Sequence, residues 1–270
     1  MGSSRLSAGA AAVVLAILPL TGAASAAPAS GARTATTNEV VLENLTWTEV
    51  RDALRAGMTT IIVPVGGVEQ SGPYVALGKH DRRVALLSVR IARALGNALV
   101  APVVAYVPEG SIAPPEGHMR FPGTLTVPDE VFEATLESAA ESFRAHGFTD
   151  VVLLGDHGGY QRDLQAVVER LRRRWGSDGA VRVHVIPEYY RARGGHAGRD
   201  DTALTLATAP SMVRLRALRA AARPGASDGV YGEDPRGATA ARGRTLADAQ
   251  VAAAVAAIRR AVARPRRAHV

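Results

Sequence analysis

The sequence predicts an α/β fold: a three-layer α/β/α sandwich in which helices cover both faces of a mostly parallel sheet. Two observations carry this prediction. Short β-branched and apolar runs alternate along the chain with longer segments whose apolar residues recur at helical spacing. The strand-like runs are apolar at nearly every position, which is typical of parallel strands that are buried on both faces.

The alternation also sets the expected elements. A capping box, Thr46-Trp47-Thr48-Glu49, starts the first helix, which stops at Gly57. No internal repeat is present, so the elements belong to one domain rather than to an array. Strands are expected at residues 59–63, 98–107, 151–154 and 181–187, and further helices at 82–95, 128–145, 164–175, 211–222 and 246–263.

The N-terminal segment has the pattern of a secretory signal peptide. Arg5 is the only charge before an Ala-rich apolar run from about Ala8 to Leu20, and Ala24-Ser25-Ala26 is an A-x-A cleavage site. This run is too short for a comfortable transmembrane helix, so we expect a secreted or extracytoplasmic protein without a stable membrane anchor. The expected organisation is a signal peptide at 1–26, a flexible lead-in at 27–40, one α/β domain at 41–264 and a basic tail at 265–270.

Composition excludes several function classes. The chain has no cysteine, which rules out disulfides, thiol nucleophiles and cysteine-ligated zinc. Its formal net charge is +7, but only 4% of its residues are aromatic and no basic run is interleaved with aromatics. The arginines of 171–174 and 259–267 fit solvated helix faces or a tail better than a nucleic-acid groove. We therefore expect no nucleic-acid partner.

One stretch, Val63 to Asp81, concentrates polar residues directly after an expected strand. The strand runs into Pro64, Gly66 and Gly67, where the chain is expected to leave the sheet. Glu69 and His80 follow in this Gly/Pro-shaped loop. Open α/β sheets bind their ligands at the carboxyl ends of strands, so the position favours a site. A solvated loop rich in charged residues is the alternative interpretation.

Two further loops carry histidines among glycines. His157 lies in the Gly155–Gly159 loop after the 151–154 strand, and His196 lies in Gly194–Gly198, shortly before Asp201. A single histidine is more often a hydrogen-bonded structural residue than a ligand, but three such loops with a glutamate suit a divalent ion such as Zn²⁺ or Mn²⁺. His118, in the 114–124 loop, is a candidate pocket-lining residue. Ser71 does not lie in a G-x-S-x-G elbow, and the chain lacks the glycine-rich phosphate loops.

These motifs resemble those of the creatininase (creatinine amidohydrolase) family over nearly the whole mature chain. The resemblance rests on five motifs in the family's order: residues 65–73 (VGGVEQSGP), 121–124 (FPGT), 156–159 (DHGG), 196–202 and 232–239 (GEDPRGAT). It implies a creatininase-like α/β/α sandwich, assembled as a homo-oligomer, that hydrolyses cyclic or linear amides with bound Zn²⁺ or Mn²⁺.

The chain departs from the family's pattern at the metal ligands. The family reads E-Q-H-G-P-H with an Asp eleven positions after the first Glu; here Ser71 replaces the first His and His80 replaces the Asp. A Glu two positions after the loop histidine is replaced by Gly159. The resemblance thus implies one ion per chain, held by Glu69, His80 and His157.

The remaining positions receive roles by the same comparison. His196 matches a histidine that acts beside the metals as acid or base, and Asp201 replaces a family Glu, so both are expected to be catalytic. Ser71, Asp81, His118 and Asp156 are expected behind the ligands or against the substrate.

The function expected from this resemblance is that of an exported, metal-dependent amidohydrolase. It would cleave a C–N amide bond of a small molecule through a metal-activated water. Creatinine itself is not expected as substrate, because the ligands differ. The alternative is a non-catalytic, secreted small-molecule-binding relative with a degenerate metal site.

The signal peptide gives the first testable prediction. N-terminal sequencing of secreted protein should find a mature terminus at or near Ala27, because cleavage follows the A-x-A site. Secreted protein that still begins at Met1 contradicts it.

Overall fold

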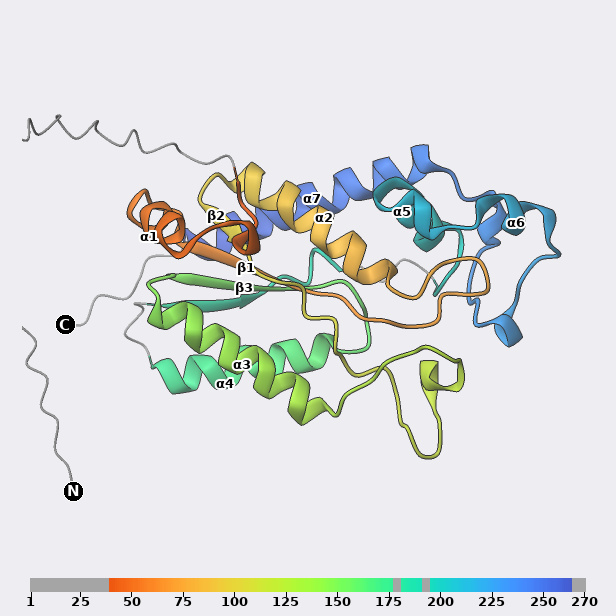
Figure 1. The fold of residues 1–270 in the computed structure, drawn as a ribbon, viewed down its shortest axis with the longest axis horizontal. Coiled ribbons are helices and arrows are strands. Elements are labelled where there is room, and N and C mark those ends of the chain that lie inside the picture. Colours follow the sequence, from red (N-terminus) through yellow and green to blue (C-terminus); the bar gives the residue numbers. More distant parts are fainter. Residues whose placement is uncertain (1–38, 177–180, 191–194, 264–270) are drawn as a thin grey trace, which may run out of the picture. The chain divides into compact units, whose positions relative to one another are not determined.

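The computed structural model describes residues 39–176, 181–190 and 195–263. Within them one parallel sheet of four strands forms the middle layer, in the order β2-β1-β3-β4 (Figure 1). The strands are β1 (Thr60–Val65), β2 (Ala98–Val100), β3 (Asp150–Gly155) and β4 (Arg182–Val185). The predicted parallel α/β sandwich is therefore confirmed.

Helices cover both faces of this sheet (Figure 1). One apolar core joins the sheet to α2, α5 and α7, and the other joins it to α3 and α4, with α1 packed against its edge. Neighbouring residues of β1 enter different cores, since Ile62 belongs to the first and Ile61 to the second. The helices are α1 (Trp47–Arg55), α2 (Lys79–Leu95), α3 (Asp129–Ala145), α4 (Gln161–Trp175), α5 (Arg199–Thr208), α6 (Leu215–Ala220) and α7 (Ala240–Val262).

The start of α1 follows the predicted capping box. The Thr46 hydroxyl accepts a hydrogen bond from the Glu49 backbone N–H, and the Glu49 carboxylate accepts one from the Thr46 N–H at 2.7 Å. Two backbone donors that the helix itself leaves unpaired are satisfied in this way.

Most element boundaries differ from the sequence prediction, and β2 differs most, because it was expected at 98–107 and ends at Val100. α2 begins at Lys79 rather than residue 82, and α7 begins at Ala240 rather than 246, where the Thr239 side chain caps it. β1 also continues through Pro64 to Val65. Proline lacks an N–H, but the Pro64 carbonyl still accepts from Val104 at 2.9 Å, so it keeps a place in the ladder.

The early start of α2 matters for function, because it places Lys79 and His80 in a rigid first turn instead of a loop.

β1 is the topological switch point of the sheet. The chain runs from β1 to β2 on one side and then returns to β3 on the other. The loops after β1 and β3 therefore leave the carboxyl ends of two neighbouring strands in opposite directions. Ligand sites of open parallel sheets lie in the crevice that such a divergence leaves.

The signal peptide, most of the lead-in and the basic tail lie outside the described residues, so export and the proposed domain limits stay predictions. Across the described ranges, none of the helices has the length and apolarity needed to cross a membrane.

The packing of α5 against α7 gives a stability prediction. A Cβ on Gly243 would overlap the Ala203 carbonyl oxygen, so Gly243→Ala should lower the free energy of unfolding by about 1–3 kcal/mol, although alanine favours a helix. Urea unfolding measures this change.

The matched control is Gly225→Ala, because a Cβ there meets no atom within 4 Å. This variant should unfold within about 1 kcal/mol of the wild type. Equal losses in the two variants would mean that the contact between α5 and α7 does not limit stability.

Candidate active site

The loops at the switch point bring together residues that are far apart in the sequence. Glu69 follows β1, His157 follows β3, His118 lies between β2 and α3, and His196 lies just before α5. One buried side chain, Tyr160, ties the first two loops together.

The Tyr160 hydroxyl donates to the carbonyl oxygens of Val65 (2.8 Å) or Gly66 (2.7 Å) and accepts from the backbone N–H groups of Asp156 and His157 at 3.1 and 3.0 Å. The ends of β1 and β3 are thereby held at a fixed spacing.

The carboxylate of Glu69 is the centre of the cluster, and it is fully buried. Its Oε2 lies 3.0 Å from His118 Nε2 and 3.5 Å from His157 Nε2, yet it has no hydrogen-bond partner within the described part of the chain. One ligand atom each from Glu69, His118, His157 and His196 can be chosen so that all lie within 4.8 Å of one another. A buried carboxylate oxygen without a donor, faced by imidazole nitrogens, fits a divalent ion.

His80 reaches the same carboxylate but is used differently. Its Nε2 lies 2.7 Å from Glu69 Oε1, and its Nδ1 lies 2.7 Å from Asp156 Oδ2. Burial and the neighbouring Lys79 charge lower the pKa of His80, but the hydrogen bonds to Asp156 and Glu69 outweigh them, so the net shift is upward. An imidazole held between two carboxylates has no lone pair left for a metal. The geometry therefore offers His118 as a ligand where the sequence predicted His80.

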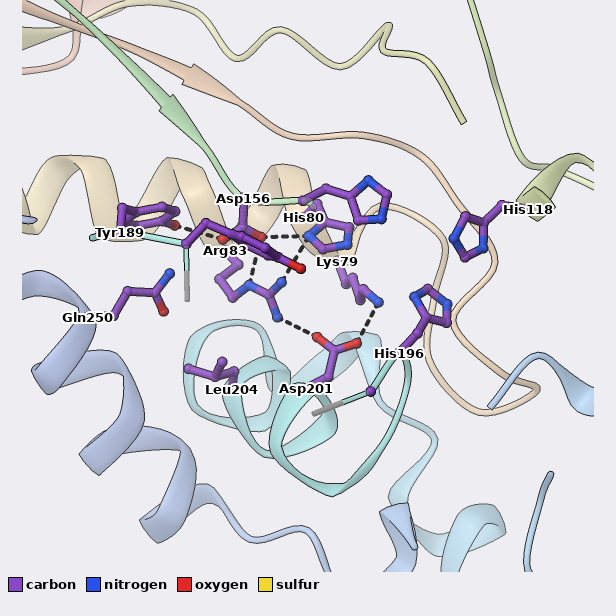
Figure 2. A pocket seen from close by; sticks show the side chains of 13 residues that line it. Lys79, His80, Arg83, His118, Asp156, Tyr189, His196, Asp201, Leu204 and Gln250 are labelled. Carbon is purple, nitrogen blue, oxygen red and sulfur yellow. Dashed lines mark hydrogen bonds and ion pairs between the residues drawn. The ribbon is translucent and has the colours of Figure 1, made fainter. Parts of the chain in front are cut away.

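A buried ionic network supports this arrangement from below (Figure 2). Lys79 Nζ binds Asp201 Oδ2 at 2.6 Å, while Arg83 binds Asp201 Oδ1 and Asp156 Oδ2, each at 2.7 Å. The Tyr189 hydroxyl donates to the other oxygen of Asp156 at 2.8 Å. Asp201 also accepts from the Ala197 N–H, so both of its oxygens are engaged in charge pairing and not directed at a substrate.

The two ring nitrogens of His196 have different surroundings. Its Nε2 donates to the Gln70 carbonyl at 2.8 Å, and its Nδ1 lies 3.5 Å from Glu69 Oε1. Burial and the Lys79 charge lower the pKa of His196 to about 4, so the ring is neutral at pH 7 and Nδ1 carries a lone pair. Burial lowers the pKa of His157 to about 3 in the same way.

Glu109 is a site residue that the sequence did not reveal. Its carboxyl group is buried without a hydrogen-bond partner among the described residues, and Oε2 lies 3.6 Å from His157 Nδ1. Burial and the Glu69 charge raise the pKa of Glu109 to about 9, so it is neutral at pH 7. Gly67, at φ +138°, makes room for it, because a Cβ there would lie 2.7 Å from Glu109 Oε1.

The other predicted residues lie around the cluster rather than in it. Ser71 is buried and lines a separate small cavity with Gly72 and Val230. Asp81 accepts from the Gly67 N–H at 2.8 Å and so braces the turn after β1. Asp156 is an anchor for His80, as described above.

A cavity of about 210 Å³ opens onto this cluster. His118, His157 and His196 line it together with Tyr190, Leu204 and Gln250. Figure 2 shows the imidazoles of His118 and His196 next to each other, with ring centroids 4.4 Å apart. The size of the cavity suits a small molecule or the end of a peptide chain.

Lys79 and Arg83 also line the cavity and were not predicted as site residues. The sequence held one indication that Lys79 is special, because it is the only lysine among 32 lysines and arginines.

The ionic network gives a pH prediction. Asp201→Asn leaves Lys79 and Arg83 buried with less compensation, which should lower the unfolding free energy of metal-free protein by about 3–5 kcal/mol at pH 7. Burial raises the pKa of Asp201, but the Lys79 and Arg83 charges lower it further, to well below its usual range. Its contribution is therefore complete above the unfolded pKa and is lost as the pH falls through the folded value.

The difference between wild type and Asp201→Asn should thus be constant from pH 7 to about pH 5 and shrink in stronger acid. Urea unfolding across this range measures it. The control is Asp248→Asn, since the Asp248–Arg90 pair is exposed and should contribute less than about 1 kcal/mol. If the difference in unfolding free energy grows as the pH falls, ionised Asp201 does not stabilise the fold through Lys79 and Arg83.

Comparison with known proteins places this site in a family. The model of the creatininase family, described as creatinine amidohydrolase, matches residues 43–258. The mycofactocin precursor peptide peptidase of Mycobacterium tuberculosis is 30% identical over an alignment of 220 positions, and the match covers 71% of this chain and 81% of that protein. The protein of the same name from Mycolicibacterium smegmatis is 30% identical over 166 residues, and the match spans 59% of this chain and 62% of that relative's length.

The fold comparison agrees. A solved structure titled as the manganese form of creatininase superimposes with a TM-score of 0.66 at 22% identity, covering 83% of this chain and 98% of that one. The creatinine amidohydrolase of Pseudomonas putida is 27% identical over an alignment of 197 positions, and the match covers 65% of this chain and 74% of that enzyme. The family match extends over most of the chain and includes every loop of the site, and the chain therefore belongs to the creatininase family.

Proposed function

We propose that this protein is an exported hydrolase that cleaves a C–N amide bond of a small molecule or peptide end with one bound divalent ion. The observation that carries this proposal is the buried Oε2 of Glu69, which lacks a hydrogen-bond partner within the described residues while two imidazole nitrogens face it. A buried anion oxygen in that state is costly unless a cation completes it.

The ligands in this proposal are Glu69, His118 and His157, and the ion is zinc or manganese. Two histidines and one carboxylate are a ligand set of catalytic zinc sites, which keep one position open. The bound ion supplies a Lewis acid and lowers the pKa of water toward neutrality.

The chain's own residues then divide the remaining work. His196 is neutral, and its Nε2 donates to the Gln70 carbonyl. Its Nδ1 accepts a proton from the attacking water and returns it to the leaving nitrogen. Glu109 lies behind His157, 3.6 Å from Nδ1, where its neutral carboxyl group can hydrogen-bond and so orient a ligating imidazole. His80, Arg83 and Asp156 keep Glu69 in place.

The substrate class rests on two observations. The cavity is small, and its wall combines the Gln250 amide with Tyr190 and Leu204, which suits a compact molecule with both polar and apolar parts. The similar proteins carry the names of a peptidase and a creatinine amidohydrolase, both of which break C–N bonds. Self-assembly into a homo-oligomer remains part of the proposal.

The test combines metal content with a screen of small amides and short peptides. Dialysed protein should contain close to one equivalent of zinc or manganese, and a chelator should abolish hydrolysis of the amide found in the screen. His118→Ala should lose the ion, because it removes one of three ligands. His196→Ala should keep the ion, and its rate of hydrolysis should fall by a factor of about 10²–10⁴.

The control variant is His146→Ala, since His146 lies at the end of α3 and takes no part in the cluster. Metal retained in His118→Ala but lost in His80→Ala would restore the ligand set predicted from sequence. A metal-loaded protein that hydrolyses no amide would instead favour a non-catalytic binding role.

A further inference from the structure

Burial and the position at the start of a helix both disfavour a cation at Lys79. It is 1% exposed, and it lies in the first turn of α2, where the helix dipole opposes positive charge. The cap residue Gly78 offers no side-chain hydrogen bond. The remaining basic residues of the chain are all arginines. A buried ammonium here therefore requires a specific reason.

The contacts of Lys79 supply that reason. Its Nζ lies 2.6 Å from Asp201 Oδ2 and 3.4 Å from Glu69 Oε1, so one ammonium connects two carboxylates from different loops. Arginine carries its charge in a planar fork, whereas lysine carries it as a compact point, close to what a metal ion presents. An ammonium also has three N–H donors. The hydrogen bond to Asp201 uses one of them and the ion pair with Glu69 can use a second, and Lys79 lines the cavity beside His118 and His196.

The two oxygens of Glu69 thus face two kinds of cation site. Oε2 faces the imidazoles that fit a divalent ion, while Oε1 is already contacted by His80 at 2.7 Å, Lys79 at 3.4 Å and His196 at 3.5 Å. A second divalent ion on the Oε1 side would stand against a fixed positive charge, and such repulsion is strong at these separations.

We infer that Lys79 is a built-in second cation of the site. Its ammonium fills the place of a second metal ion between Glu69 and Asp201, and its remaining N–H donates to the carbonyl oxygen of the bound amide. The second role rests on the proposed function, whereas the first is independent of it. In the reaction this N–H stabilises the oxygen as negative charge develops on it, and no proton or electron leaves Lys79.

The occupancy role is tested with zinc alone. Calorimetry measures Zn²⁺ binding to wild type, Lys79→Gln, Lys79→Met and Lys79→Arg. The control is Arg170→Met, which removes an ion pair between α4 and Glu137 of α3, away from the site. The Gln and Met variants should bind one equivalent more than wild type, because neither Glu69 Oε1 nor Asp201 Oδ2 then faces a fixed ammonium. The Arg variant and the control should match wild type. The glutamine variant can still hydrogen-bond Asp201, which guards against a folding defect.

The electrophilic role is tested by turnover of the amide found in the screen. Lys79→Gln should lower kcat by about 10²–10³ with KM little changed and the wild-type ion retained. An unchanged zinc count in both neutral variants overturns the occupancy role, and unchanged kcat overturns the electrophilic role. Failure of the proposed function has a different signature: no amide is hydrolysed by wild type, while the extra zinc equivalent in the neutral variants still appears.

Discussion

The structure of this site depends on one buried carboxylate, that of Glu69. Taking an ionised carboxylate out of water is expensive, and here the compensation is divided between its two oxygens. One oxygen is met by donors that the protein itself provides, chiefly His80. The other is surrounded by imidazole nitrogens and lacks a donor within the described chain. The fold thus holds a fixed anion at the switch point of a parallel sheet, with one of its two oxygens lacking a hydrogen-bond donor among the described residues.

The layers explain how so many charges can share a small volume. Glu69 arrives on a loop from β1, the network beneath it stands on the first turns of α2 and α5, and the imidazoles come from separate loops. No single element carries both members of the pairs Lys79–Asp201 and Arg83–Asp201. The charges therefore join two helices of one layer to the sheet edge, and the cluster contributes to the packing of that layer as well as to the site.

Much of this was readable from the sequence. Strand composition and the capping box predicted the sheet and α1, and the motifs around Glu69, His157 and His196 predicted which loops converge. The use of His80 was not readable, because spacing shows that a histidine is near but not which groups occupy its nitrogens. Glu109 lies in a loop whose path depends on distant contacts, so no local pattern marks it. The network of Lys79 and Arg83 could not be predicted, because it depends on α2 beginning at Lys79, which brings both side chains to Asp201.

The Tyr160 hydroxyl has a consequence for how this protein can change over evolution. Because it fixes the ends of β1 and β3 to each other from beneath, the positions of Glu69 and His157 do not depend on the far wall of the cavity. That wall is built from other parts of the chain, including Leu204 on α5 and Gln250 on α7. Reactivity and selectivity are thus held by separate parts of the scaffold, and exchanging a few wall side chains can redirect the same chemistry to a new molecule.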